Sequence, residues 1–241
     1  MNQRVPGHGP LDATICLIGG MPSIEDTQAG RPFAFSDKPA IYHAGNELMH
    51  QWIRAAGIDP DSIRLEHVCE YAAPNCKFNH IQAHTAYLTP NPIVKRIMLL
   101  EGITDAEIHD TGALGWLDDL RTRLDRLPNL KVIGAIGSWP ARLLLERRDI
   151  ESTKHRGSCF LHNINGRDIT IVPMLHPTWV LEKKLWELRL LCMNDAIKIR
   201  KIAAGFDWQA TAPQIHAPTD HSDARYCLLR LKKLCNLYPA R

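Results

Sequence analysis

Four short runs rich in β-branched residues punctuate the chain, and each has the length of a β-strand. They cover residues 14–18, 63–69, 131–136 and 169–175. The first, third and fourth are continuously apolar, which is typical of parallel strands buried on both faces. The second contains Arg64, Glu66 and His67, and polar groups in a central strand need either partners or a function.

Segments with helical spacing of apolar residues separate these runs. Residues 44–56 predict a helix that ends at Gly57, and Ser138 is the expected N-cap of a second helix with Pro140 in its first turn. Residues 186–204 predict a long third helix. Strands that alternate with helices predict an α/β fold with a central parallel four-stranded sheet and helices on both faces.

This pattern divides the chain into one domain and a tail. The domain is expected over residues 1–205, with an insertion over residues 76–128. Residues 206–241 are expected to form a connector and a final helix, over residues 224–234, that packs on the domain. Within the insertion, His80 and His84 have helical i, i+4 spacing but no acidic third ligand, so we predict no metal site.

Composition excludes several classes of protein. The 241 residues are 45% hydrophobic and 23% charged, as in globular proteins, and no apolar run approaches the length of a membrane span. The first residues lack the apolar segment of a signal peptide, so we expect a cytoplasmic protein. We also expect a monomer. Seven scattered cysteines without a C-x-x-C pair are expected to be reduced thiols.

The segments that follow the first and fourth predicted strands carry the candidate chemistry, because ligands bind beyond the carboxyl ends of parallel strands. Residues 19–33 are Gly-Gly-Met-Pro-Ser-Ile-Glu-Asp-Thr-Gln-Ala-Gly-Arg-Pro-Phe, which combines close-approach glycines, two acids and an aromatic ring. Residues 176–178 are His-Pro-Thr, and the histidine could donate a hydrogen bond into the same cleft.

These two motifs resemble those of the uracil-DNA glycosylase superfamily, and in particular its bacterial and archaeal iron-sulfur branch. That branch has G-E-A-P-G-x-x-E-D-x-x-G-R-P-F after its first strand and H-P-S after its last. The resemblance covers residues 5–204 and implies a DNA glycosylase that flips out a base. It also implies that His176 stabilises the leaving base and that Phe33 stacks on it. The iron-sulfur branch begins with a C-x-x-C segment that this chain lacks, so we expect no cluster and no other cofactor.

The chain departs from the family at the catalytic carboxylate, whose position is Gly20 here. The carboxylate steadies positive charge on the sugar and orients water, a role that could pass to Asp26 or Glu25, or to a positioned water alone. The alternative is that both acids are solvated loop residues, or that one of them caps Arg31. Gly20 also removes a side chain from the pocket floor, which predicts room for an enlarged base beside Met21.

A further departure concerns the asparagine that, in the family, binds the uracil edge. The equivalent position is Glu66, or His67 if the register slips by one residue, and Asn75 is a further candidate base contact. An ionised carboxylate only accepts hydrogen bonds, so Glu66 would favour the amine of a cytosine-type base over uracil. Alternatively, Glu66 faces solvent or pairs with Arg64.

DNA is the expected partner. Trp179, Val180 and Leu181 occupy the place of the family's apolar wedge, unless they cap the core, and Lys183, Lys184 and Ser138 are expected to contact the DNA. Residues 1–120 contain 8 basic and 15 acidic residues, whereas residues 121–200 contain 15 and 8. The net charge of +3 therefore conceals a basic half around His176 that suits a phosphate backbone.

These features predict a monofunctional DNA glycosylase that leaves an abasic site. Its substrate is expected to be a modified, cytosine-type pyrimidine, and defence against viruses with hypermodified bases is one setting for such an enzyme. One alternative is uracil-DNA repair without the motif carboxylate, and another is a catalytically silent DNA-binding domain.

Overall fold

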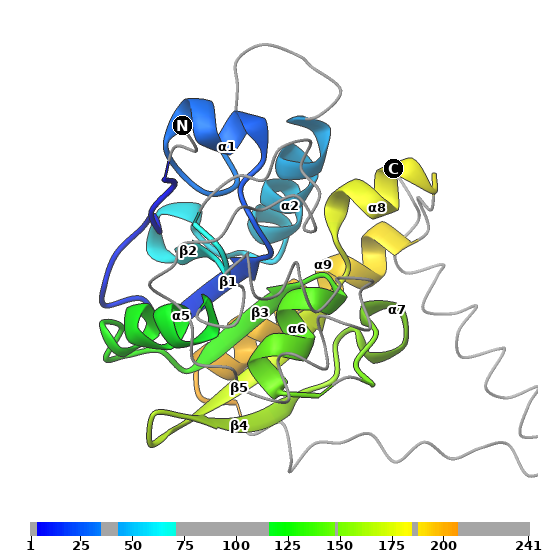
Figure 1. Cartoon of the computed structure of the whole chain (residues 1–241). Helices are drawn as coiled ribbons and strands as arrows, with labels where there is room; N and C mark the ends of the chain where they lie inside the picture. Colours follow the sequence, from blue (N-terminus) through cyan, green and yellow to red (C-terminus); the bar gives the residue numbers. More distant parts are fainter. Residues whose placement is uncertain (1–3, 35–42, 71–115, 148, 185–187, 207–241) are drawn as a thin grey trace, which may run out of the picture. The chain divides into compact units, whose positions relative to one another are not determined.

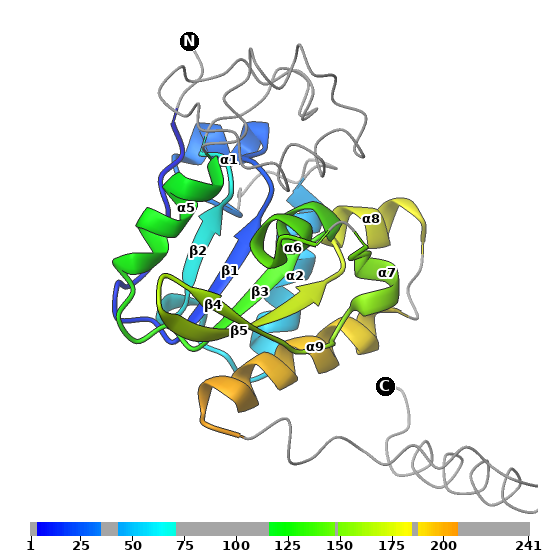
Figure 2. The ribbon, with the colours of Figure 1, turned by 60° about the horizontal axis from the view of Figure 1, so that its bottom comes forward.

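A five-stranded sheet forms the centre of the computed structural model, which describes residues 4–34, 43–70, 116–147, 149–184 and 188–206 (Figure 1). Its strands are β1 (Ile15–Gly19), β2 (Arg64–His67), β3 (Val132–Ile136), β4 (Phe160–Ile164) and β5 (Arg167–Met174). They lie in the order β2-β1-β3-β5-β4 (Figure 2). Strands β2, β1, β3 and β5 are parallel, which confirms the α/β class and the four predicted strands.

The fifth strand is a difference from the predicted sheet. Strand β4 runs antiparallel to β5 at the sheet edge, and its residues alternate in exposure, so it lacks a continuous apolar run. A tight turn joins the two strands, with Asn165 at φ 51° and Gly166 at φ 83°. Asn-Gly is a strong hairpin signal, and it could have predicted this strand pair from the sequence.

Helices cover both faces of the sheet, as expected. They are α1 (Ile24–Ala29), α2 (His43–Ala55), a 3₁₀ turn η1 (Pro60–Ser62), α5 (Trp116–Asp125), α6 (Ser138–Leu145), α7 (Ser152–His155), α8 (Pro177–Glu182) and α9 (Leu188–Ala203). The prediction of Ser138 as an N-cap was wrong by one residue, because Gly137 occupies that position with φ 94°. None of the described helices is long and apolar enough to cross a membrane.

Alternation along the strands divides the core between the two faces. On one face, Cys16 and Ile18 of β1 pack in one cluster with the apolar residues of α5 and α6. On the other face, Leu17 lies next to α9, where Gly134 allows close packing: a Cβ atom there would be 2.5 Å from Leu17 and 2.9 Å from Ile199. The sheet is therefore buried on both sides, as its apolar runs predicted.

Most of the predicted insertion and all of the tail beyond Phe206 lie outside the described residues. His80 and His84 belong to that part of the chain, as does the predicted final helix over residues 224–234. The predicted domain boundary therefore stays a prediction.

A buried arginine joins α5 to β2. The Arg123 guanidinium forms ion pairs with Glu66 and with Asp119, and it donates to the carbonyl oxygens of His67 and Val68 at 2.9 and 3.0 Å. Glu66 is only 1% exposed, and its other oxygen accepts from Arg64 Nε at 2.9 Å. A buried charge of this kind is stable only while its partners remain in place.

Arg123→Ala should destabilise the fold by about 3 to 5 kcal/mol, because it leaves the Glu66 carboxylate buried with one cation fewer. Urea unfolding followed by circular dichroism measures this change. The matched control is Arg126→Ala, an exposed arginine just after the same helix, which should change stability by less than about 0.5 kcal/mol. Equal losses in the two variants would contradict the buried network.

Candidate active site

The carboxyl edge of the sheet brings the two sequence motifs together. Strand β1 is followed by Gly20, β2 ends at His67, β3 is followed by Gly137, and β5 leads to His176. A Cβ atom on Gly137 would lie 3.7 Å from the His176 ring, and a Cβ atom on Gly19 would lie 2.8 Å from the His67 ring. The bare backbone of Gly19 therefore allows the close approach of the His67 imidazole, whereas the His176 ring lies at ordinary contact distance from Gly137, and both lie at the ligand-binding edge of the sheet.

His176 is the N-cap residue of α8, where Pro177 supplies the first helical position. Its side chain keeps an exposed face. Where the ring meets the protein, desolvation, aided by nearby His67 and opposed by Asp26, lowers the pKa of His176 to about 4. The imidazole is therefore neutral at pH 7, and it can donate one hydrogen bond without carrying a charge.

Asp26 is not a solvated loop acid. It is 2% exposed and forms a capping box with Ser23 at the start of α1, in which Asp26 Oδ2 accepts from Ser23 N at 2.9 Å. Its Oδ1 accepts from Ala34 N at 2.7 Å and from Asn46 Nδ2 at 3.3 Å. His67 Nε2 lies 3.2 Å from Oδ2.

These hydrogen bonds determine the charge of Asp26. Burial opposes ionisation, but the bonds from His67, Ser23 and Ala34 outweigh it and hold the pKa of Asp26 below its usual value. Because both oxygens already accept hydrogen bonds, Asp26 is a poor candidate for orienting water, whereas Glu25 of the same helix is half-buried. The pattern Ser23-x-x-Asp26 is the signal that could have predicted the cap.

The pleat of β2 separates the two candidates for base recognition. Glu66 pairs in register with Ile18 and points towards α5, where Arg64 and Arg123 occupy its carboxylate. His67 pairs with Gly19 and points to the opposite face, towards Asp26. The expectation that Glu66 contacts the base is therefore wrong, since successive residues face opposite sides of a sheet. His67, the other candidate, lies on the face of the motif loop.

Phe33 lies beside His67 with an unusual backbone. Its φ is 51°, which few residues other than glycine adopt without strain. His50 Nε2 lies 3.1 Å from the Phe33 carbonyl oxygen, and the two rings of Phe33 and His67 have centroids 4.8 Å apart. The loop therefore places the ring that the family resemblance assigns to base stacking next to the His67 imidazole.

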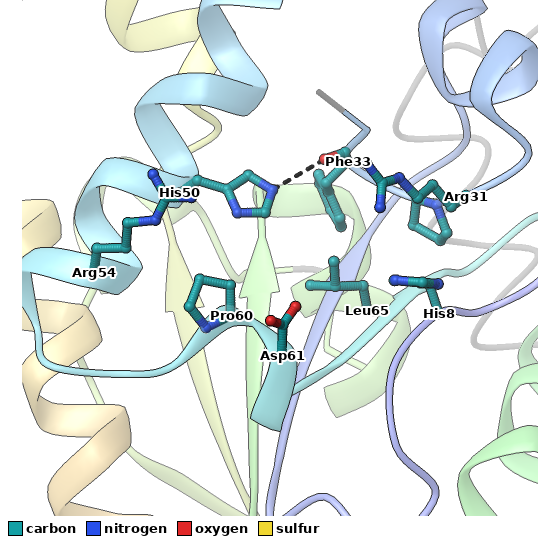
Figure 3. Close-up of a pocket in the computed structure, with 9 residues that line it drawn as sticks. His8, Arg31, Phe33, His50, Arg54, Pro60, Asp61 and Leu65 are labelled. Atoms are coloured by element: carbon teal, nitrogen blue, oxygen red, sulfur yellow. Dashed lines mark hydrogen bonds between the residues drawn. The ribbon is translucent and has the colours of Figure 1, made fainter. Parts of the chain in front are cut away.

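Phe33 is one of the residues that line a cavity of about 160 Å³ (Figure 3). Among its lining residues are Arg31, His50, Asp61 and Leu65. Neither His67 nor His176 lines it, so it adjoins the carboxyl-edge site and is not that site.

Trp139 occupies the region from which the family carboxylate is missing. A Cβ atom on Gly20 would lie 3.0 Å from Cε3 of Trp139 and 3.3 Å from Cζ3. Trp139 and Met21 are both partly buried and pack against the core cluster of α5 and α6. The space left by the glycine is therefore partly filled by an indole ring that neither sequence motif contains.

The predicted DNA-contacting residues fall into two groups. Lys183 and Lys184 are exposed after α8, and Trp179 and Leu181 are partly buried against a cluster that includes Leu48 and Trp52. One prediction was wrong, because Val180 is fully buried in that cluster and has no surface to offer DNA. The partly exposed Ser138 accepts from Ser152 N at 2.8 Å, which ties it to α7, and its DNA contact stays a prediction. Asn75 lies outside the described residues.

The part of the chain that the structure describes does not fit an iron-sulfur cluster. Cys69 follows β2 in the region of the expected ligands, but it is 1% exposed and belongs to the apolar core cluster. No three His, Cys, Asp or Glu side chains gather as metal ligands among the described residues. We therefore derive no step through a metal.

Comparison with known proteins agrees with this geometry. The model of the uracil-DNA glycosylase superfamily matches residues 6–197, so the chain belongs to that superfamily and is a DNA glycosylase. A type-4 uracil-DNA glycosylase from Thermotoga maritima is 24% identical over 196 residues, which are 81% of each chain. The resemblance found in the two motifs is thus confirmed over most of the domain.

The pKa of His176 predicts a pH dependence of stability. Between about pH 6.5 and 4 the unfolded chain binds a proton at this position that the folded chain does not, so the free energy of unfolding should fall as the pH falls through that window. In His176→Gln this contribution is absent, and the fall should be shallower. Urea unfolding of both proteins at several pH values measures the difference, and parallel curves would contradict a neutral folded His176.

Proposed function

We propose that this glycosylase hydrolyses the N-glycosidic bond of a flipped-out, modified pyrimidine in DNA and does not cleave the DNA strand. The proposal rests chiefly on one observation, the position of His176 beside Gly137 at the carboxyl edge of the sheet. Cleavage breaks the bond between the sugar C1′ and the base nitrogen, and the electron pair leaves with the base. A water oxygen then bonds to C1′, which leaves an abasic site.

His176 donates a hydrogen bond to the oxygen of the departing base, where negative charge develops. A neutral imidazole suits this role, because it still carries one N–H group that can donate a hydrogen bond to the anion. Glu25 serves the positively charged sugar and its water, since Asp26 is fully engaged in hydrogen bonds. Phe33 stacks on the flipped ring.

An enlarged, cytosine-type base is the substrate we favour over uracil. The family's carboxylate is replaced by Gly20, beside which Trp139 fills part of the space, and the family's asparagine is replaced at the end of β2. Such a pocket suits defence against viruses whose genomes carry hypermodified bases. Uracil repair is the second candidate, because the relative from Thermotoga maritima is a uracil-DNA glycosylase.

The first test uses duplexes that carry uracil, hydroxymethylcytosine or glucosylated hydroxymethylcytosine, followed by alkali to cleave abasic sites. We expect scission at a modified cytosine, and a rate about a hundredfold lower in His176→Ala, the cost of removing one donor from a developing anion. The matched control is His162→Ala on the edge strand β4, which should retain the wild-type rate. Scission at uracil alone would favour repair, and none on any duplex would contradict both candidate activities.

Lys183 and Lys184 provide a second test, because they are exposed directly after α8. Replacing both with glutamine should weaken DNA binding at low salt and reduce the slope of log K against log salt by about one for each phosphate that is no longer neutralised. The control is Lys131→Gln, an exposed lysine that precedes β3 at the opposite edge of the sheet. Fluorescence anisotropy across a salt series measures the slopes, and the same slope in all three proteins would place the DNA elsewhere.

A further inference from the structure

The His67 ring has one nitrogen engaged and one open. Nε2 lies 3.2 Å from Asp26 Oδ2, whereas Nδ1 is buried and has no hydrogen-bond partner within the described chain. Nδ1 faces the bare backbone of Gly19, where a Cβ atom would lie 2.8 Å away. A buried polar atom without a partner costs free energy, and a base edge that bonds to His67 Nδ1 would recover that cost.

Asp26 determines which ring nitrogen carries the hydrogen. Its low pKa keeps it ionised, and an ionised carboxylate can only accept hydrogen bonds. When the His67 ring carries a single hydrogen, Nε2 must therefore donate to Asp26, which leaves Nδ1 as an acceptor. The carboxylate is held by the backbone of Ser23 and Ala34 and by the Asn46 amide, so it cannot turn away to release this tautomer.

We infer that Asp26 is a positioning residue that presents His67 Nδ1 as a single hydrogen-bond acceptor to the base, and that this acceptor selects a base with an exocyclic amine. The inference rests on the proposed glycosylase function and names His67 as the residue that determines its substrate class. An amine at C4 of a cytosine-type base donates to Nδ1, whereas the C4 carbonyl of a uracil-type base presents another acceptor.

Phe33 covers this nitrogen in the free protein. The same Cβ atom on Gly19 would lie 2.7 Å from Phe33 Cζ, so the Phe33 ring and the His67 imidazole both lie against the Gly19 backbone. Phe33 also lines the 160 Å³ cavity, where Figure 3 shows it above Leu65 and Asp61. The Phe33 ring must move out of this contact before a base edge can reach Nδ1.

The test uses two duplexes that carry hydroxymethylcytosine or hydroxymethyluracil, which share one substituent and differ in the group at C4. Wild-type protein should prefer the cytosine-type base by about tenfold or more in kcat/KM, the discrimination of a matched hydrogen bond. In His67→Asn the preference should approach unity, because an amide offers both a donor and an acceptor. His162→Asn is the matched control and should keep the wild-type preference.

The tautomer has its own measurement. Long-range proton–nitrogen NMR spectra of the free protein, in mildly alkaline solution, distinguish a protonated from a bare ring nitrogen. We expect hydrogen on Nε2 in the wild type. In Asp26→Asn an amide group can donate to Nε2, so the hydrogen should move to Nδ1 and the base preference should fall or invert.

The outcomes separate this inference from the proposed function. Equal rates on both duplexes, or hydrogen on Nδ1 in the wild type, would overturn the His67 inference while the glycosylase activity stands. If neither duplex loses its base and the uracil and glucosylated duplexes are also untouched, the proposed function fails and the substrate class fails with it. A preference that survives in His67→Asn would assign recognition to another residue.

Discussion

One buried carboxylate organises the motif loop. Asp26 closes the capping box of α1 and accepts from the Ala34 backbone, from Asn46 of α2 and from His67 of β2. Donors from four points of the chain between Ser23 and His67 thus converge on two oxygen atoms. Because the group is ionised and nearly free of water, losing any donor leaves charge exposed to an apolar interior. The position of Phe33 and the orientation of the His67 ring both depend on this carboxylate.

The opposite face of β2 has a second charge centre with a different purpose. Glu66 and Arg123 hold α5 against the sheet, away from the motif loop. Two adjacent residues of this four-residue strand therefore have different roles: Glu66 stabilises the fold, and His67 belongs to the candidate site. Strand geometry makes this division possible, since neighbouring side chains on a strand cannot compete for the same space.

Much of this architecture could be predicted from apolar periodicity and from two motifs. The four parallel strands, the long last helix and the proximity of His176 to the Gly19 loop follow from patterns that are local in sequence. The roles of Glu66, Val180 and Ser138 did not follow, because each depends on which way a side chain points and on a partner far along the chain: Arg123, the α2 core and Ser152. Trp139 was missed for the same reason, because nothing in its own segment indicates that its ring packs beside Gly20.

The contact between Gly20 and Trp139 links two positions that are over a hundred residues apart in the sequence. A carboxylate side chain at position 20 must extend past a Cβ atom that already lies 3.0 Å from the indole ring. Restoring the family's acid therefore requires the ring to shift or be replaced. The two positions are therefore coupled, and the size of the residue at position 20 limits where the ring at position 139 can lie.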